Sequence, residues 1–181
     1  MNSRFHCHPN KVSVEPQLRV GEPFKYQVKR EGSRVTKIEK SIEIRAPSEK
    51  VWEMLALDRM PEWAFKGDLK SVVYTSEVHT AKDKYRVGVT AHIIDKRREH
   101  DVEITESLEN EKMMYRSKPP YHTYTSTYIL KPVEGRTKLT WISDVEMPGG
   151  ILGRALGGLT HGAGEKQAEK SLEDLKSILE K

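Results

Sequence analysis

The residues of this chain that could perform acid–base chemistry are a few histidines, tyrosines and one aspartate, on predicted strands and on a predicted C-terminal helix. An unperturbed histidine pKa of about 6.5 suits a general acid or base, so a histidine buried beside a bound molecule could serve as one. The candidates are His92, His100, Tyr115, Tyr124, Tyr128, Asp144 and His161. The sequence has no His-Glu-x-x-His, Gly-x-Ser-x-Gly or phosphate-binding loop, and therefore predicts no particular reaction.

Strand and helix periodicity argues against a catalytic role for most of these residues. His92 and Asp144 are out of phase with their apolar neighbours, so we expect both to face solvent. His100 is in phase with its neighbours but lies at a strand end, and His161 falls between the apolar stripes of the helix. Catalysis by any one histidine is therefore the weaker interpretation.

Neither a metal nor a nucleotide cofactor is predicted. His6, Cys7 and His8 carry metal-capable side chains, but three adjacent residues do not easily converge on one ion, and no second group of ligands follows. A frayed terminus explains them better. The glycines within residues 153–158 do not join a strand to a helix in a βαβ unit, as a dinucleotide loop must.

Large side chains with an apolar body are better candidates for contact with a ligand than for chemistry. Met113, Tyr115, Tyr124, Tyr128 and Trp141 occupy the strand phase that we assign to the concave face of a sheet. Apolar walls with a few polar tips are typical of small-molecule pockets. For any one of these side chains, packing in a solid core is an equally good explanation.

The elements that would position these side chains begin with a strand over residues 35–46, whose isoleucines share one face. Two short helices follow. The first begins at Pro47 or Ser48, and the second has Asp58 as its cap and ends at Gly67.

Six strand candidates with connections of hairpin length come next. They cover residues 69–77, 84–95, 100–108, 113–118, 123–131 and 138–147. A run of strands followed by one helix predicts an α+β fold with an antiparallel sheet, whose apolar face the helix must cover.

Residues 148–181 predict that helix, long and either continuous or broken once. One apolar stripe consists of Leu152, Ala155, Leu156, Leu159 and Ala163, and a nearly opposite one of Ala168, Leu172, Leu175 and Leu179. Four glycines at positions 157, 158, 162 and 164 lie between the stripes, and each weakens a helix interior by about 1 kcal/mol relative to alanine. We expect the second half to pack on the sheet and the first half to bend and to cover something else, which could be a cavity.

Composition limits the class of protein. The 181 residues, of which 36% are hydrophobic, suit one domain over residues 33–181, preceded by an extension over residues 1–32. The net charge of +4 comes from interspersed charges without a dense basic patch, so we expect no nucleic-acid partner. No apolar run is long enough for a membrane span, and neither an internal disulfide nor a signal peptide is predicted, so we expect a cytoplasmic protein. The oligomeric state stays open.

Three segments carry a resemblance to a known family. They are the strand-to-helix junction IRAPSEKVW at residues 44–52, the segment DRMPEW at residues 58–63 and the hairpin LKPVEGRTKL at residues 130–139. With the order of elements, they resemble the START-like superfamily, also called SRPBCC, which includes polyketide cyclases/dehydrases, lipid-transport proteins and the birch-pollen-allergen fold. The resemblance covers about residues 35 to 181. It implies a helix-grip fold, in which a curved sheet wraps the C-terminal helix around an apolar pocket.

The resemblance implies that a hydrophobic small molecule is the partner: a lipid, isoprenoid, quinone or polyketide-like compound. The residues expected to contact it are Trp63, Val89, Ala91, Met113, Tyr115, Tyr124, Tyr128, Trp141, Leu152, Leu156, Leu159 and Ala163. Two alternatives remain open: a cyclase/dehydrase-type enzyme that uses the same pocket, and an interaction module like the co-chaperone branch of the superfamily. Charged residues on the outward strand phase disfavour the latter.

Overall fold

The computed structural model describes residues 34–96, 99–117, 124–147 and 151–181 of the chain. The extension expected over residues 1–32, with the group His6, Cys7 and His8, lies outside the described residues.

The described chain folds in the predicted order of one strand, two short helices, six strands and a long helix, with one further short helix before the third strand. The elements are β1 (Arg34–Ile44), α1 (Ser48–Glu53), η1 (Leu57–Glu62), β2 (Leu69–Tyr74), η2 (Lys82–Tyr85), β3 (Thr90–Asp95), β4 (Glu99–Leu108), β5 (Lys112–Ser117), β6 (Tyr124–Val133), β7 (Arg136–Met147) and α2 (Ile151–Leu179).

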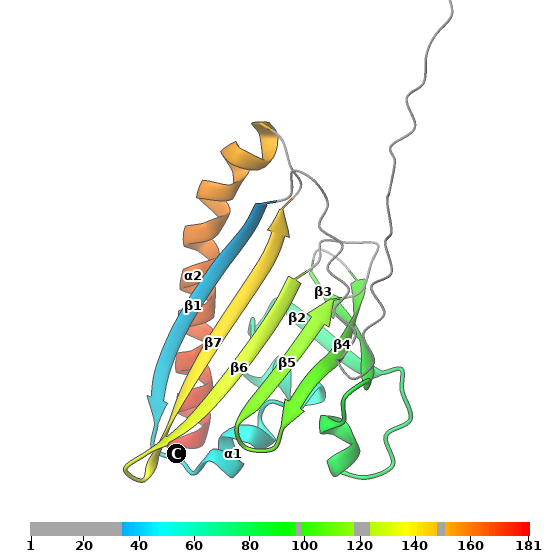
Figure 1. The fold of residues 1–181 in the computed structure, drawn as a ribbon, viewed down its shortest axis with the longest axis vertical. Coiled ribbons are helices and arrows are strands. Elements are labelled where there is room, and N and C mark those ends of the chain that lie inside the picture. The colour runs from blue at the N-terminus through cyan, green and yellow to red at the C-terminus, as the bar shows by residue number, and fades with distance from the viewer. Residues whose placement is uncertain (1–33, 97–98, 118–123, 148–150) are drawn as a thin grey trace, which may run out of the picture.

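The strands form one curved antiparallel sheet of seven strands, in the order β1-β7-β6-β5-β4-β3-β2. Helix α2 lies along β1 and β7 on one face of this sheet, as Figure 1 shows. The short helices complete the layer on the same side, because η1 packs on β2 while α1 contacts β6 and β7. This arrangement confirms the predicted α+β helix-grip fold.

Tight turns set the register of the sheet. In the β6–β7 hairpin Val133 pairs with Arg136, and the two residues between them, Glu134 and Gly135, have φ angles of 43° and 76°. Two-residue turns of this left-handed kind match the twist of antiparallel strands. The resulting register places Tyr128 opposite Trp141, so both rings project from the same face.

The strand expected over residues 84–95 is wrong in its first half. The structure has the 3-10 helix η2 there, and β3 begins only at Thr90. Gly88 explains the difference, because its φ of 87° is a left-handed conformation that interrupts a strand. Val87 consequently points outward, with 54% of its surface exposed, whereas Val89 and Ala91 are buried as predicted.

The first helix begins at Ser48 as predicted, whereas the predicted Asp58 cap of the second helix is wrong. Pro47 occupies the cap position of α1 without a side-chain hydrogen bond, and the hydroxyl of Ser48 lies 3.3 Å from that of Thr137 on β7. Ala56 precedes η1, and the Asp58 carboxylate binds side chains of β2 and η2 instead of capping the helix. The side chains of Ser48 and Asp58 thus interact with residues distant in the sequence instead of with the backbone N–H groups of their own helices.

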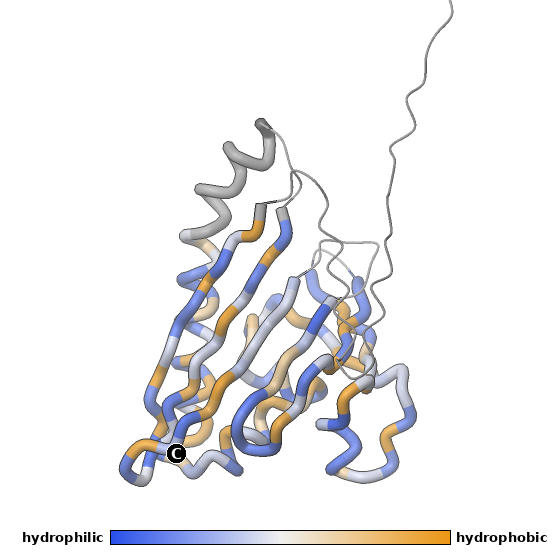
Figure 2. The backbone as a smooth tube through the Cα atoms, viewed as in Figure 1, coloured by the Kyte–Doolittle hydropathy of each residue, from blue (hydrophilic) through white to orange (hydrophobic). Residues whose placement is uncertain are grey.

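Helix α2 is continuous from Ile151 to Leu179, so its glycines do not break it. Its second stripe packs as predicted, because Ala168, Leu172 and Leu175 are buried and Leu179 packs against the core. Apolar and polar residues alternate along parts of the strands, as the hydropathy colouring of Figure 2 shows, and core residues such as Ile104, Tyr128 and Leu139 are buried.

Candidate ligand-binding site

Four large aromatic side chains meet on the concave face of the sheet. Trp63, Tyr115, Tyr128 and Trp141 are each at most 2% exposed. The rings of Tyr128 and Trp141 stack with centroids 5.4 Å apart, and Trp63 meets both edge-on at 5.9 and 6.3 Å. Such edge-to-face and stacked pairs are favourable arrangements of aromatic rings. The structure thus brings together four of the side chains that the sequence predicted as ligand contacts.

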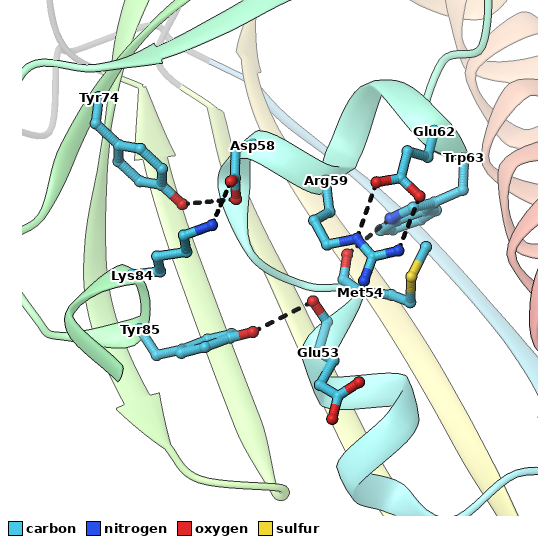
Figure 3. Close-up of polar contacts among 9 residues, drawn as sticks. All are labelled: Glu53, Met54, Asp58, Arg59, Glu62, Trp63, Tyr74, Lys84 and Tyr85. Atoms are coloured by element: carbon cyan, nitrogen blue, oxygen red, sulfur yellow. Dashed lines mark hydrogen bonds and ion pairs between the residues drawn. The ribbon is translucent and has the colours of Figure 1, made fainter. Parts of the chain in front are cut away.

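Trp63 comes from the segment after η1 and is fixed by its indole group. Its Nε1–H donates to the carbonyl oxygen of Met54 at 2.8 Å, which Figure 3 shows. The hydroxyl of Tyr115 donates to the neighbouring carbonyl of Leu55. The Trp63 donor therefore joins the segment after η1 to the end of α1, and the Tyr115 donor fastens the residue after that end to β5.

Asp58 fastens the same segment from its other side. Its carboxylate accepts a hydrogen bond from the Tyr74 hydroxyl at 3.0 Å and pairs with the Lys84 ammonium at 2.5 Å, as Figure 3 shows. Burial is the main cause that raises the pKa of Tyr74, and the negative charge of Asp58 raises it further. Tyr74 therefore stays a neutral donor at physiological pH, and the group connects η1 with β2 and η2.

The indole of Trp141 differs from that of Trp63 because its donor is unused. Its Nε1 is buried, and in the part of the chain that the structure describes it has no hydrogen-bond partner. Buried donors without a partner are rare in folded proteins, and each one calls for an explanation.

Phe65 lies against this indole at the boundary with solvent. Its ring centroid is 5.5 Å from that of Trp141, yet 41% of its surface is exposed. Its φ of 51° is unusual for a residue with a side chain. The buried hydroxyl of Ser171 on α2 holds this conformation by accepting the Phe65 backbone N–H at 3.0 Å. Phe65 is the exposed ring among the aromatic side chains that contact Trp141.

Farther along the same face the side chains become polar. Ser126 and Ser143 pair across β6 and β7, one inward position beyond Tyr128 and Trp141. Next to them the Nε2 of buried His100 lies 2.9 Å from the Tyr124 hydroxyl. The concave face therefore consists of an aromatic half and a hydroxyl-rich half.

Helix α2 approaches the sheet closely at one glycine. A Cβ on Gly164 would lie 2.6 Å from the Cδ1 of Ile38 on β1. The next residue, Glu165, has a carboxylate oxygen 3.8 Å from the Lys40 ammonium nitrogen, which adds an ion pair between α2 and β1. The absence of a side chain at Gly164 therefore lets the helix backbone lie against β1.

The remaining predicted contacts have different surroundings. Met113 is fully buried among the core residues, together with Val89 and Ala91, whereas Ala163 is exposed. Leu152, Leu156 and Leu159 lie in the N-terminal half of α2, where the side chains are outside the described residues, as is that of His161.

The polar candidates on the outward face have surface partners. The Nδ1 of His92 lies 2.8 Å from an oxygen of Asp101, and Glu99 lies 3.6 Å from its Nε2. The hydrogen bond to Asp101 is the main cause that raises the pKa of His92. This histidine and half-buried Asp144 occupy outward positions, as the periodicity predicted.

Burial also governs the chemistry of the inner tyrosines. It raises the pKa of both Tyr115 and Tyr128 well above the usual tyrosine range. Both hydroxyls are therefore neutral at physiological pH and act as hydrogen-bonding groups instead of bases.

Within the described residues, no three His, Cys, Asp or Glu side chains gather where they could hold a metal ion. None of the described helices has the length and apolar character that a membrane crossing requires.

A curved antiparallel sheet that grips a C-terminal helix over an aromatic concave face defines the helix-grip class of proteins. Within this class, residues 35–180 match the family described as "Polyketide cyclase / dehydrase and lipid transport", and the chain belongs to that family. No curated protein matches the chain.

Solved structures with low sequence identity share the fold. A Staphylococcus aureus protein of unknown function has 13% identity and a TM-score of 0.65, over 82% of this chain and 95% of that one. A Bacillus halodurans protein has 18% identity and a TM-score of 0.60, over 81% and 99%. The Aha1 dimer from Colwellia psychrerythraea has 17% identity and a TM-score of 0.57, over 80% and 97%.

Sequence reasoning missed Phe65, Ser171 and the use of Asp58. Each owes its role to a contact between segments that are far apart in the chain, such as Phe65 with Ser171. No local pattern marks these residues, because a loop phenylalanine and a helical serine look ordinary in the sequence.

Proposed function

We propose that the protein binds an apolar or amphipathic small molecule, such as a lipid, isoprenoid, quinone or aromatic polyketide, between the concave face of the sheet and α2. The observation that carries this proposal is the aromatic group around Trp141, which combines buried rings, an indole donor without a partner in the described part of the chain, and the half-exposed ring of Phe65. The family description, with its lipid transport and polyketide cyclases, supports the same class of ligand.

Apolar burial would supply enough free energy for capture from water. A ligand that buries about 300 Å² gains about 7 kcal/mol at roughly 25 cal/mol/Å², before the cost of association. The polar half of the concave face, with Tyr124 and His100, would orient a polar end of the ligand. This division suits an amphipathic molecule better than a purely apolar one.

Entry would take place where the packing is weakest. Phe65 is the exposed member of the aromatic group, and it lies between the short helices and α2. Displacement of its ring would uncover Trp141 while the fully buried rings stay in place. A local opening of this kind costs much less than global unfolding.

Native mass spectrometry of the protein purified from its own source tests the proposal. We expect a mass excess that disappears after denaturation and organic extraction, and the extract then identifies the molecule. A protein of unmodified mass that also fails to bind a panel of lipids, quinones and aromatic ketones would contradict the proposal.

The pair of His100 and Tyr124 favours an enzyme as the second candidate function. The two groups lie within hydrogen-bonding distance, and such a pair could move a proton during a cyclisation or dehydration. Incubation with polyketide-like substrates separates the two functions. An enzyme converts the substrate, and His100→Phe then lowers turnover by a larger factor than affinity, whereas a carrier returns the compound unchanged.

The outer face of the sheet gives little support to an interaction module. One outward side chain of β1, that of Val35, is apolar, and the others are Lys37, Glu39, Ser41 and Glu43, all exposed. A docking site for a protein chain generally needs a contiguous apolar patch, which this strand does not provide.

A further inference from the structure

Among the hydrogen-bond donors of the aromatic group, the indole of Trp141 is the one without an acceptor in the described part of the chain. The indole of Trp63 donates to the carbonyl oxygen of Met54, and the Tyr115 hydroxyl donates to that of Leu55. The donors of these two neighbours are satisfied by the fold, and Trp141 is left with a directional polar group in an apolar setting.

The position of Trp141 on the sheet indicates which part of a ligand would meet its indole donor. On one side along β7 the next inward residue is the fully buried Leu139, and on the other it is half-buried Ser143. Trp141 therefore lies where the apolar half of the concave face meets the polar half. In a ligand that spans both halves, the apolar body would end beside Trp141, and its first oxygen or nitrogen atom would lie there.

We infer that the ligand carries a hydrogen-bond acceptor, a carbonyl or ether oxygen, that receives the Trp141 Nε1–H, with a flat apolar body against the rings of Trp63 and Tyr128. This inference rests on the proposed function and narrows it to aromatic or isoprenoid ketones, quinones and related oxygenated molecules. An acceptor restores the hydrogen bond that the indole lost on burial, and a hydrocarbon of the same shape leaves it unpaired.

Equilibrium dialysis with fluorenone and fluorene, which differ by one carbonyl group, tests the inference. For each protein we take the ratio of the dissociation constants of fluorene and fluorenone. The two probes also differ in polarity, but this difference affects every variant alike and cancels when the ratios of two proteins are compared. We expect the wild-type ratio to favour fluorenone by about tenfold more than the ratio of Trp141→Phe, as one hydrogen bond of ordinary strength would give. The matched control, Trp52→Phe, makes the same change in a buried tryptophan outside the group and should keep the wild-type ratio.

Nuclear magnetic resonance of the wild-type protein gives a readout that needs no variant. The three tryptophans give three indole N–H signals. We expect fluorenone to shift the proton signal of Trp141 downfield, as a new hydrogen bond does, and fluorene to leave it without such a shift.

The outcomes separate this inference from the proposed function. If both probes bind, the ratio is the same in wild type and Trp141→Phe, and the Trp141 signal does not move downfield with fluorenone, the acceptor is wrong while the binding function stands. If neither probe binds, both the inferred acceptor and the proposed binding of aromatic ligands are contradicted.

Discussion

The hydrogen bond between Ser171 and Phe65 should hold the segment that covers Trp141, and Ser171→Ala removes it with almost no change in volume. The Ser171 hydroxyl is fully buried, accepts the Phe65 N–H at 3.0 Å and donates to the Gln167 carbonyl at 2.9 Å. Loss of the acceptor leaves a backbone donor in poor contact with water. We expect a destabilisation of about 1–2 kcal/mol, toward the lower end of the range for unpaired donors because Phe65 itself is half-exposed.

Ser177→Ala is the matched control on the same helix. Its hydroxyl donates to the Glu173 carbonyl at 2.9 Å, four residues earlier like that of Ser171, but it is exposed. Alanine is the better helix former, so this variant should be neutral or more stable by up to about 0.5 kcal/mol. The difference between the two variants therefore isolates the contact with Phe65.

Urea denaturation at neutral pH measures both variants, and thermal melting gives a second value. We expect the melting temperature of Ser171→Ala to fall by about 2–8 °C at constant m-value in urea. Ligand exchange should become faster in this variant alone, because the Phe65 segment opens more easily. Equal stabilities of Ser171→Ala and Ser177→Ala would refute the reasoning, because they would show that α2 does not hold the segment through this bond.

Two further predictions concern the glycines of α2 and alkaline pH. Gly162→Ala should stabilise the protein by about 0.5–1 kcal/mol in urea denaturation, because among the described residues no atom beyond its own helical neighbours lies within 4 Å of the added Cβ. Gly164→Ala should gain less or lose stability, because Ile38 must move; an equal gain at both positions would contradict the close contact. The pKa values of Tyr115 and Tyr128 are raised by burial, so the unfolded chain releases these protons first. Their contribution to stability is complete below about pH 10, and above it these two protons should lower stability by about 2.8 kcal/mol per pH unit, about 1.4 each. Tyr128→Phe should reduce the measured slope by about 1.4 kcal/mol per pH unit, while other tyrosines with a raised pKa, such as Tyr74, keep their share. An unchanged slope would show that the Tyr128 hydroxyl ionises in the folded state.

Much of the site could be predicted because strand alternation is a local property. Tyr115, Tyr128 and Trp141 were assigned to one face from their spacing alone, and burial of all three confirms the assignment. The strand expected from residue 84 failed because a single left-handed glycine, Gly88, overrides the favourable alternation around it. The predicted Asp58 cap failed because partners from β2 and η2 reach the carboxylate.

The sequence by itself determined the order of the elements, the inner face of each strand and the second stripe of α2, because these depend on periods of two and about four residues within one segment. Only the tertiary structure decided that Trp63 meets Trp141 and that Phe65 lies against the same indole, whose donor has no partner among the described residues. These contacts join residues more than seventy positions apart. The path of the whole chain sets their distances, and whether a donor finds an acceptor depends on ångström-scale placement that no local pattern carries.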